Sequence, residues 1–280
     1  RFMQPLTSVR SAPLLPLLLL PLIAVSGSTL GPKAGSVSPL TSQQRNINTF
    51  MRSASAVVWD VDGTLVESTT LGFVATNEVL KLRGFPEISV EQYKIGCRYT
   101  TPDRFNHHVG EEPGTAIGTQ LGQDFDDMYV KRVSKETAGL FDGMERLLRS
   151  LALSGHPQGA LSNACGDYVR AVLAANNLDE VPGQRIGLFG VAYGADEVPA
   201  AKPAGDGLLL CCEQLGASPE SSVYVGDSPS DGKAARNAGM QSIGVLWGAN
   251  GKAALEGEFD VLVDDVPALV EALRHLLGDA

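Results

Sequence analysis

The sequence predicts an α/β fold, with a doubly wound, Rossmann-like parallel sheet as the core and a small helical cap domain inserted into it. Three observations predict this class. Short, almost continuous apolar runs alternate with helical apolar spacing from Ala56 onward, as in parallel sheets covered on both faces. Residues 69–140 interrupt this alternation and contain no convincing strand pattern. The 280 residues are 44% hydrophobic and 19% charged, which is the composition of a globular protein.

The expected strands and helices follow from these runs in chain order. Apolar and β-branched runs predict buried strands at 56–59, 159–161, 222–225, 242–246 and 261–263. Apolar residues at helical spacing predict helices at 144–151, 169–173, 208–215 and 269–277. Asp142 and Glu145 are expected to form a capping box at the start of the first of these helices. The core domain is therefore predicted over 56–68 and 141–280. The helical cap is predicted over 69–140, with helices near 71–83 and 120–135.

A targeting leader is predicted over residues 1–55. No Asp or Glu precedes Asp60, and the twelve-residue apolar run Pro13–Ala24 is shorter than the ~20 residues of a membrane-spanning helix. It is typical of a signal peptide, and the acid-free, Ser- and Thr-rich stretch 26–55 has transit-peptide composition. A signal peptide followed by a transit segment resembles the two-part targeting sequence of plastid proteins, so we expect a chloroplast location. The secretory pathway is the alternative. No membrane span is expected in the mature protein.

Charge and cysteine content exclude several classes of protein. The net charge is −10, so the basic surface of a nucleic-acid-binding protein is not expected. The four cysteines have neither a CxxC pair nor zinc-like spacing, which argues against a disulfide scaffold or a structural zinc site. Cys165 is either a redox-sensitive thiol or a small buried apolar residue. The sequence does not indicate an oligomeric state.

Acidic residues follow two of the predicted strands. Asp60 and Asp62 come after the first strand, and Asp227 and Asp231 come after the strand at 222–225. Because ligands bind at the carboxyl ends of strands in open α/β sheets, these side chains are expected at one edge. Such a cluster needs a cation, and Mg²⁺ is a hard ion that prefers oxygen ligands and also binds substrate phosphate oxygens.

The same edge has groups suited to phosphate chemistry. Ser162 and Asn163 follow the strand at 159–161 and offer polar donors for phosphoryl oxygens, and Lys202 offers a positive charge. An ionised Asp60 can attack phosphorus to form an aspartyl-phosphate. Asp62 can protonate the leaving oxygen and later activate water.

Four motifs in this order resemble the haloacid dehalogenase-like hydrolase superfamily: Asp60–Leu65 (DVDGTL), Ser162–Asn163, Lys202–Pro203 and Gly226–Asp231 (GDSPSD). The resemblance implies an enzyme with Mg²⁺ as cofactor. It implies that Asp60 is nucleophile and metal ligand, Asp62 acid/base and a ligand through its carbonyl, and Asp227 a metal ligand. It further implies that Ser162, Asn163 and Lys202 bind the phosphoryl group. Asp231 is expected to support the metal site rather than anchor it.

Within the superfamily, the stretch from Phe141 is most similar to phosphoglycolate phosphatases, notably at 141–143, 224–228, 234–240 and 244–248. This similarity implies a phosphatase for a small phosphorylated metabolite, 2-phosphoglycolate. The chain departs from that group at Glu67, where Asp is common, and at Ser162-Asn163-Ala164, where Thr-Asn-Lys is usual. The alternatives are a broad-specificity sugar-phosphate phosphatase or a phosphomutase. The non-enzyme alternatives are a phospho-receiver or a catalytically dead binding module.

Four residues of the predicted cap have two interpretations each. Arg98 or Arg104 can grip a substrate carboxylate, although a surface salt bridge is the default expectation. His107 and His108 either touch substrate or are structural or exposed.

Overall fold

The computed structural model describes residues 55–179 and 187–277, so the predictions for the leader lie outside the described residues. A six-stranded sheet in the order β5-β4-β1-β6-β7-β8 forms the core, and every pair of neighbouring strands is parallel. Its strands are β1 (Val57–Trp59), β4 (Gln158–Leu161), β5 (Val191–Tyr193), β6 (Val223–Gly226), β7 (Gln241–Val245) and β8 (Val261–Val263). The predicted strands are confirmed to within one residue at each end, whereas β5 was not predicted.

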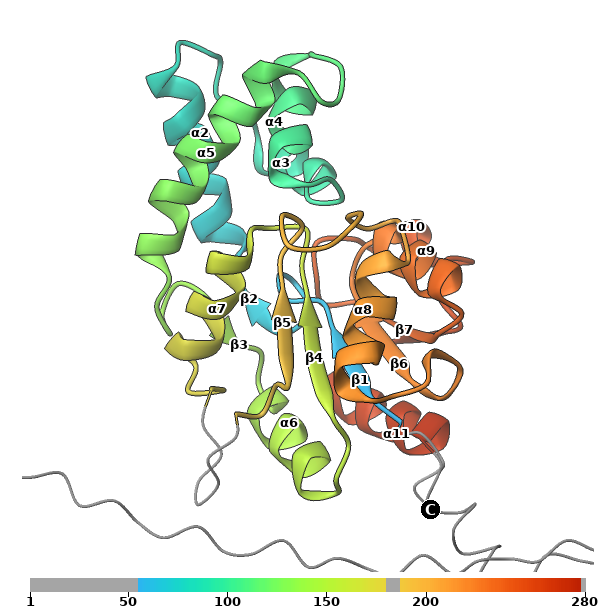
Figure 1. Ribbon diagram of the computed structural model, residues 1–280. Coiled ribbons are helices and arrows are strands. Elements are labelled where there is room, and N and C mark those ends of the chain that lie inside the picture. The colour runs from blue at the N-terminus through green and yellow to red at the C-terminus, as the bar shows by residue number, and fades with distance from the viewer. Residues whose placement is uncertain (1–54, 180–186, 278–280) are drawn as a thin grey trace, which may run out of the picture. The chain divides into compact units, whose positions relative to one another are not determined.

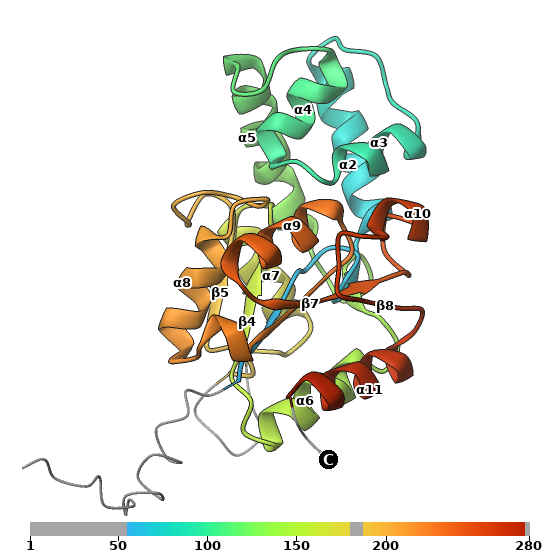
Figure 2. The same cartoon turned by 90° about the vertical axis from the view of Figure 1, so that its right-hand side faces the viewer.

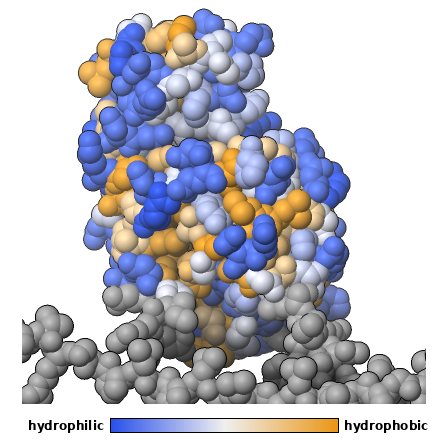
Figure 3. Space-filling model, viewed as in Figure 1, coloured by the Kyte–Doolittle hydropathy of each residue, from blue (hydrophilic) through white to orange (hydrophobic). Residues whose placement is uncertain are grey.

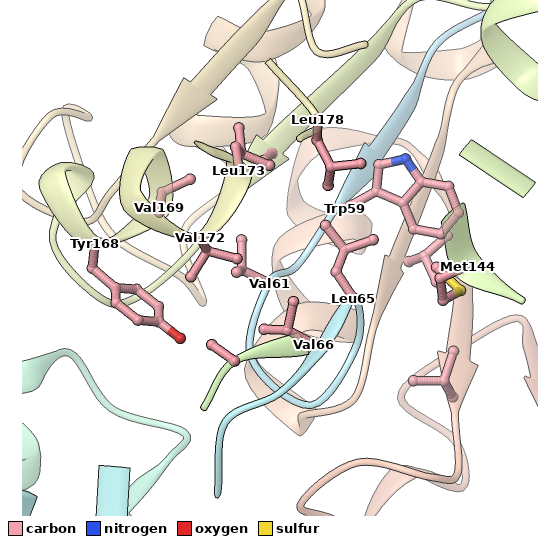
Figure 4. Close-up of a cluster of buried hydrophobic side chains, with 14 of the residues drawn as sticks. Trp59, Val61, Leu65, Val66, Met144, Tyr168, Val169, Val172, Leu173 and Leu178 are labelled. Atoms are coloured by element: carbon pink, nitrogen blue, oxygen red, sulfur yellow. The ribbon is translucent and has the colours of Figure 1, made fainter. Parts of the chain in front are cut away.

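Helices cover both faces of this sheet (Figures 1 and 2). Val58 and Tyr224 are buried with apolar residues of α8 (Asp206–Leu215) and α9 (Pro229–Ala238). The alternate residues Val57 and Trp59 pack on the opposite side, as the period of two in a strand requires. There they contact an apolar cluster formed by α6 (Met144–Leu153), α7 (Gly166–Ala175) and α11 (Val266–Leu277), part of which is drawn in Figure 4. The doubly wound α/β class is confirmed.

Between two short strands the described chain is helical. β2 (Val66–Glu67) and β3 (Gly139–Leu140) pair antiparallel, and the helical elements between them are α2 (Thr69–Leu82), α3 (Val90–Gly96), α4 (Thr101–Val109), α5 (Ala116–Tyr129) and η1 (Val130–Arg132). We call residues 69–132 the helical segment. It lies beyond the carboxyl ends of the sheet strands in both views (Figures 1 and 2). The division of the chain into cap and core domains remains a prediction, and the boundaries proposed for it fall next to the β2–β3 pair.

Two local expectations were wrong. Helix α6 begins after Gly143, which adopts a left-handed conformation (φ 87°), and no side chain caps the helix. Asp142 therefore precedes the capping position and forms no capping box. The helix expected at 208–215 lies within α8, but Leu209, which the apolar spacing places on its buried stripe with Leu208, Cys212 and Leu215, is 45% exposed.

The remaining described elements are η2 (Pro219–Ser221) and α10 (Lys252–Leu255). Large apolar side chains on the face in Figure 3 occur in separate patches between hydrophilic ones. None of the helices within residues 55–179 and 187–277 has the length and apolar character needed to span a membrane.

Candidate active site

The loop after β1 brings Asp60 and Gly63 to the carboxyl edge of the sheet. The amide of Asp60 donates a hydrogen bond to the carbonyl of Val225 on β6 (2.8 Å), so Asp60 still follows the sheet. The chain then turns at Gly63, whose φ of 74° is strained for any residue with a side chain. A Cβ atom at this position would also overlap the Asp227 carboxylate. Position 63 therefore requires glycine both for its backbone conformation and for the space next to Asp227.

Three buried carboxylates meet at this edge. Oxygen atoms of Asp60, Asp227 and Asp231 all lie within 4.8 Å of one another. Burial, and then the negative charge of Asp231, raise the pKa of Asp60 to about 7, against the opposing effect of Lys202. Burial and the neighbouring Asp60 and Asp231 raise the pKa of Asp227 well above its usual value. A divalent cation would relieve this repulsion, and an all-carboxylate donor set suits a hard ion, so these residues fit a metal site.

Lys202 is the positive charge within the cluster. Its Nζ donates to Asp60 Oδ1 (2.6 Å), to the Tyr224 hydroxyl (2.9 Å) and to the carbonyl of Leu161 (3.2 Å), and pairs with Asp231 Oδ1 (2.6 Å). Burial alone would lower the pKa of this amine, but Asp231 and Asp60 raise it above its usual value. Lys202 therefore stays protonated beside the carboxylate predicted to be the nucleophile.

Asp231 is fixed by more partners than its neighbours in the cluster. Its Oδ2 accepts the amide proton of Ser228 (2.9 Å), and its Oδ1 accepts the Tyr224 hydroxyl (3.1 Å) as well as the lysine contact. This arrangement agrees with a supporting role. Sequence reasoning missed Tyr224, although a tyrosine in a buried strand signals a hydrogen-bond partner, because its hydroxyl is rarely buried without one.

Asp62 lies apart from the three clustered carboxylates and is held by hydroxyl groups. Its Oδ1 accepts hydrogen bonds from Ser68 (2.5 Å), Tyr168 (2.5 Å) and Tyr129 (3.3 Å). Its Oδ2 accepts a long hydrogen bond from Ser162 (3.5 Å). Neither tyrosine was predicted from the sequence. Tyr129 is on α5 and Tyr168 is on α7, and no motif links them to the first loop.

Ser162 and Asn163 follow β4 at the same edge. The Ser162 hydroxyl accepts the amide proton of Ala164 (3.0 Å). The Asn163 side-chain amide donates to the carbonyl of Lys202 (3.1 Å) and, more weakly, to that of Arg98 (3.5 Å). Asn163 thus braces the backbone that carries Lys202. Its direct contact with substrate stays a prediction.

One cavity gathers the residues singled out from the sequence. It is lined by Asp60, Asp62, Ser162, Asn163, Lys202, Asp227 and Asp231 from the core, and by Tyr93, Cys97, Tyr99, Thr101, Arg104, Phe125 and Tyr129 from the helical segment. The site is therefore built from both parts of the described chain. Sequence reasoning found the sheet side of the cavity and, apart from Arg104, missed the helical side.

Arg98, His107, His108 and Cys165, also singled out from the sequence, do not line this cavity. His107 is exposed, and burial and the charge of Arg104 lower the pKa of His108 to about 3. Burial raises the pKa of the Cys165 thiol to about 12, which favours the inert interpretation over a redox-sensitive thiolate. The default expectation of a surface salt bridge is wrong for Arg104, which is buried and forms no ion pair with a described residue.

The fold and this acidic cavity define a doubly wound α/β protein with a site suited to phosphate chemistry at the carboxyl edge of the sheet. The model of the haloacid dehalogenase-like hydrolase family matches residues 57–245, and the chain belongs to that family.

The chain is similar to curated phosphatases. The chain is 31% identical over 227 residues to a phosphoglycolate phosphatase of Xanthomonas campestris, covering 79% of this chain and 97% of that protein. It is 28% identical to a phosphoglycolate phosphatase of Yersinia pestis, covering 79% of this chain and 94% of that one. The chain is accordingly an enzyme of the phosphatase type.

Solved structures show the same fold. A predicted phosphoglycolate phosphatase from Haemophilus somnus superimposes with a TM-score of 0.68 at 22% identity, covering 79% of this chain and 99% of that one. A β-phosphoglucomutase from Clostridium difficile superimposes with a TM-score of 0.66 at 15% identity, covering 81% and 98%. Phosphatases and a mutase share this architecture, so the fold alone does not separate these activities.

Proposed function

We propose that this protein is a Mg²⁺-dependent phosphatase that hydrolyses a small phosphate monoester, 2-phosphoglycolate, through an aspartyl-phosphate on Asp60. The observation that carries the proposal is the buried group of Asp60, Asp227 and Lys202 facing the same cavity as Asp62. It combines a nucleophile, a phosphate-binding cation and a separate acid/base group in one space.

Each residue has a distinct part in the proposed reaction. Lys202 orients one oxygen of Asp60 and draws the phosphoryl group towards it, while the other oxygen of Asp60 attacks phosphorus. The bond from phosphorus to the ester oxygen breaks as Asp62 gives that oxygen a proton. Asp62 then takes a proton from water, which attacks the acyl-phosphate and releases phosphate and free Asp60. Ser68, Tyr129 and Tyr168 hold Asp62 in position between these two proton transfers.

Asp60 and Asp227 would hold the metal ion, with Asp231 behind them, and the family resemblance adds the main-chain carbonyl of Asp62. When bound, Mg²⁺ supplies charge neutralisation that lets an anionic phosphate enter an acidic site.

The substrate is proposed from the relatives together with the charge of the cavity. The phosphoglycolate phosphatases of Xanthomonas campestris and Yersinia pestis each align with 79% of this chain. The cavity also contains a second cation, Arg104, opposite the sheet edge, which suits a phosphate ester with another negative group.

Phosphate release from a panel of esters tests the proposal. With Mg²⁺ we expect release from 2-phosphoglycolate at a higher kcat/KM than from glucose 1-phosphate or glucose 6-phosphate. Excess chelator should abolish the activity, and Ca²⁺ should restore it poorly because it favours more and longer ligand bonds. Full turnover in chelator would refute the metal dependence. Conversion of glucose 1-phosphate to glucose 6-phosphate without phosphate release would identify a mutase.

A further inference from the structure

Arg104 on α4 differs from the arginines of the described chain that form ion pairs. It is 8% exposed, and its Nε and Nη2 atoms are buried without a hydrogen-bond partner. Six arginines nearer the surface pair with carboxylates: Arg83, Arg132, Arg149, Arg170, Arg236 and Arg274. A guanidinium carries five N–H donors and remains charged in proteins, so leaving it buried and unpaired is unfavourable.

Aromatic rings surround the charged group of Arg104. Its Cζ lies 4.4 Å from the centroid of Phe125, 5.5 Å from that of Tyr93 and 5.6 Å from that of Phe105. Cation–π contacts of this kind offset part of the desolvation but leave the N–H donors unused. Helix α3 also packs on the side chain, since a Cβ atom at Gly96 would come within 2.9 Å of Arg104 Cγ. The guanidinium is therefore held in place before any ligand arrives.

No carboxylate within the described ranges neutralises Arg104 directly. Asp126 on α5 is close enough for its charge to act on Arg104, yet the two form no ion pair, and Asp126 Oδ1 is itself buried without a partner. Arg104 instead lines the cavity that contains Asp60 and Lys202. The cavity thus has a phosphoryl-binding end at the sheet and a second, unsatisfied cation at the helical end.

We infer that Arg104 is a specificity-determining residue that binds a second anionic group of the substrate, a carboxylate on the organic part of the phosphate ester. The inference rests on the proposed phosphatase function and deepens it. A planar guanidinium matches a carboxylate with paired hydrogen bonds, and the aromatic surroundings strengthen the attraction by excluding water. A substrate with a hydroxyl in place of the carboxylate would leave Arg104 unpaired, so the site selects against it.

Two esters with the same skeleton test this inference in the full chain with Mg²⁺. They are 2-phosphoglycolate and 2-hydroxyethyl phosphate, which has CH₂OH where the first has the carboxylate. We expect the wild-type protein to favour 2-phosphoglycolate in kcat/KM. Arg104→Met should reduce that preference by about 10–100-fold, the usual effect of losing a hydrogen bond between charged groups. The loss should come mainly from a higher KM, because Arg104 lies away from the reacting phosphorus.

Arg104→Lys and Asp126→Asn complete the design. Arg104→Lys keeps the positive charge but cannot form the paired hydrogen bonds of a guanidinium, so its preference for 2-phosphoglycolate should be intermediate. Asp126→Asn should keep the wild-type preference. Equal losses on both esters in Arg104→Met would overturn the inference and leave the phosphatase function standing. If both Arg104 variants unfold, as judged by circular dichroism, a wild-type preference below tenfold overturns it. No phosphate release from either ester by the wild-type protein would overturn the proposed function as well.

Discussion

Lys202 neutralises two carboxylates that are themselves buried, so its removal is expected to damage both stability and activity. Lys202→Met leaves Asp60 and Asp231 without their shared cation, and breaking a buried ion pair in this way costs about 3–5 kcal/mol. Lys233 is the matched control, because it pairs with Glu258 at 3.7 Å with its side chain half exposed. Lys233→Met should cost less than about 1 kcal/mol. Urea unfolding of the two variants measures the difference, and equal costs would contradict the assigned role of Lys202.

The crowding of carboxylates predicts a pH dependence of stability in the metal-free protein. The pKa of Asp227 is raised in the folded protein, so the folded state retains a proton that the unfolded chain releases above about pH 4. The free energy of unfolding therefore decreases as the pH rises above about 4. Asp60, whose pKa is raised to about 7, contributes to this decrease up to neutral pH. Asp227→Asn removes one of these charges. In chelator, its free energy of unfolding should increase relative to wild type between pH 5 and pH 8.

Mg²⁺ should make the wild-type protein more stable than Asp227→Asn, the reverse of the order expected in chelator. It should raise the melting temperature of the wild-type protein at pH 8 and have little effect on Asp227→Asn, because the variant lacks a proposed ligand. Asp124→Asn, which changes a surface ion pair, is the control and should respond to Mg²⁺ as the wild type does. Parallel pH profiles for wild type and Asp227→Asn in chelator would refute the account of the acidic cluster.

At the scale of elements, α5 and α7 meet over Asp62. The rings of Tyr129 and Tyr168 stack with centroids 4.4 Å apart, and their hydroxyls are 3.1 Å apart. Tyr168 is part of the apolar cluster in Figure 4. The packing of the Tyr168 ring on the core therefore positions its hydroxyl to donate a hydrogen bond to Asp62, the proposed acid/base group.

Tyr168→Phe keeps this packing and removes the shorter of the two tyrosine contacts to Asp62. We expect kcat for 2-phosphoglycolate to fall about tenfold, since a hydrogen bond to a charged group is lost, with a melting temperature close to wild type. Tyr193→Phe, a partly buried tyrosine on β5, is the control and should retain kcat. A wild-type kcat in Tyr168→Phe would show that the hydroxyl does not position Asp62.

The elements predicted from the sequence were those with a strong local signal. β1 and β6 are continuous apolar runs, as expected for a parallel strand that is buried on both faces, and β7 is buried in all but its first residue. β5 is three residues long and only partly buried. α3 is short and has only two buried residues, and α4 is short and largely polar, so the formation of all three depends on packing rather than on local pattern. The start of α6 was misread because the left-handed turn at Gly143 places the chain differently from a side-chain cap.

At the scale of the whole molecule, the candidate site unites segments of two kinds. Asp60, Ser162 and Asp227 each follow the end of a predicted strand, so the topology of a parallel sheet is enough to predict that they converge. Lys202 lies in the loop after β5, which was not predicted, and was assigned to the site through its place among the four motifs. Arg104 and Tyr129 line the cavity from helices, and Tyr168 contacts Asp62 from α7. Helical periodicity predicts only which face of a helix is apolar. The convergence of these three residues required the packing of α4, α5 and α7 around the carboxyl edge. The convergence of the residues on the sheet side of the cavity was thus predictable from the sequence, and that of the residues from the helices was not.

Asp60 is proposed to carry the phosphoryl group, and a rapid-quench experiment with ³²P-labelled 2-phosphoglycolate detects that intermediate. Asp62→Asn keeps the nucleophile but removes the base, a group typically worth 10²–10⁴-fold in rate, so labelled protein should accumulate before turnover. Proteolysis of the quenched variant and peptide mapping should place the label on Asp60, and Asp60→Asn should give neither label nor turnover. A label on Ser162, or wild-type turnover by Asp60→Asn, would contradict the account.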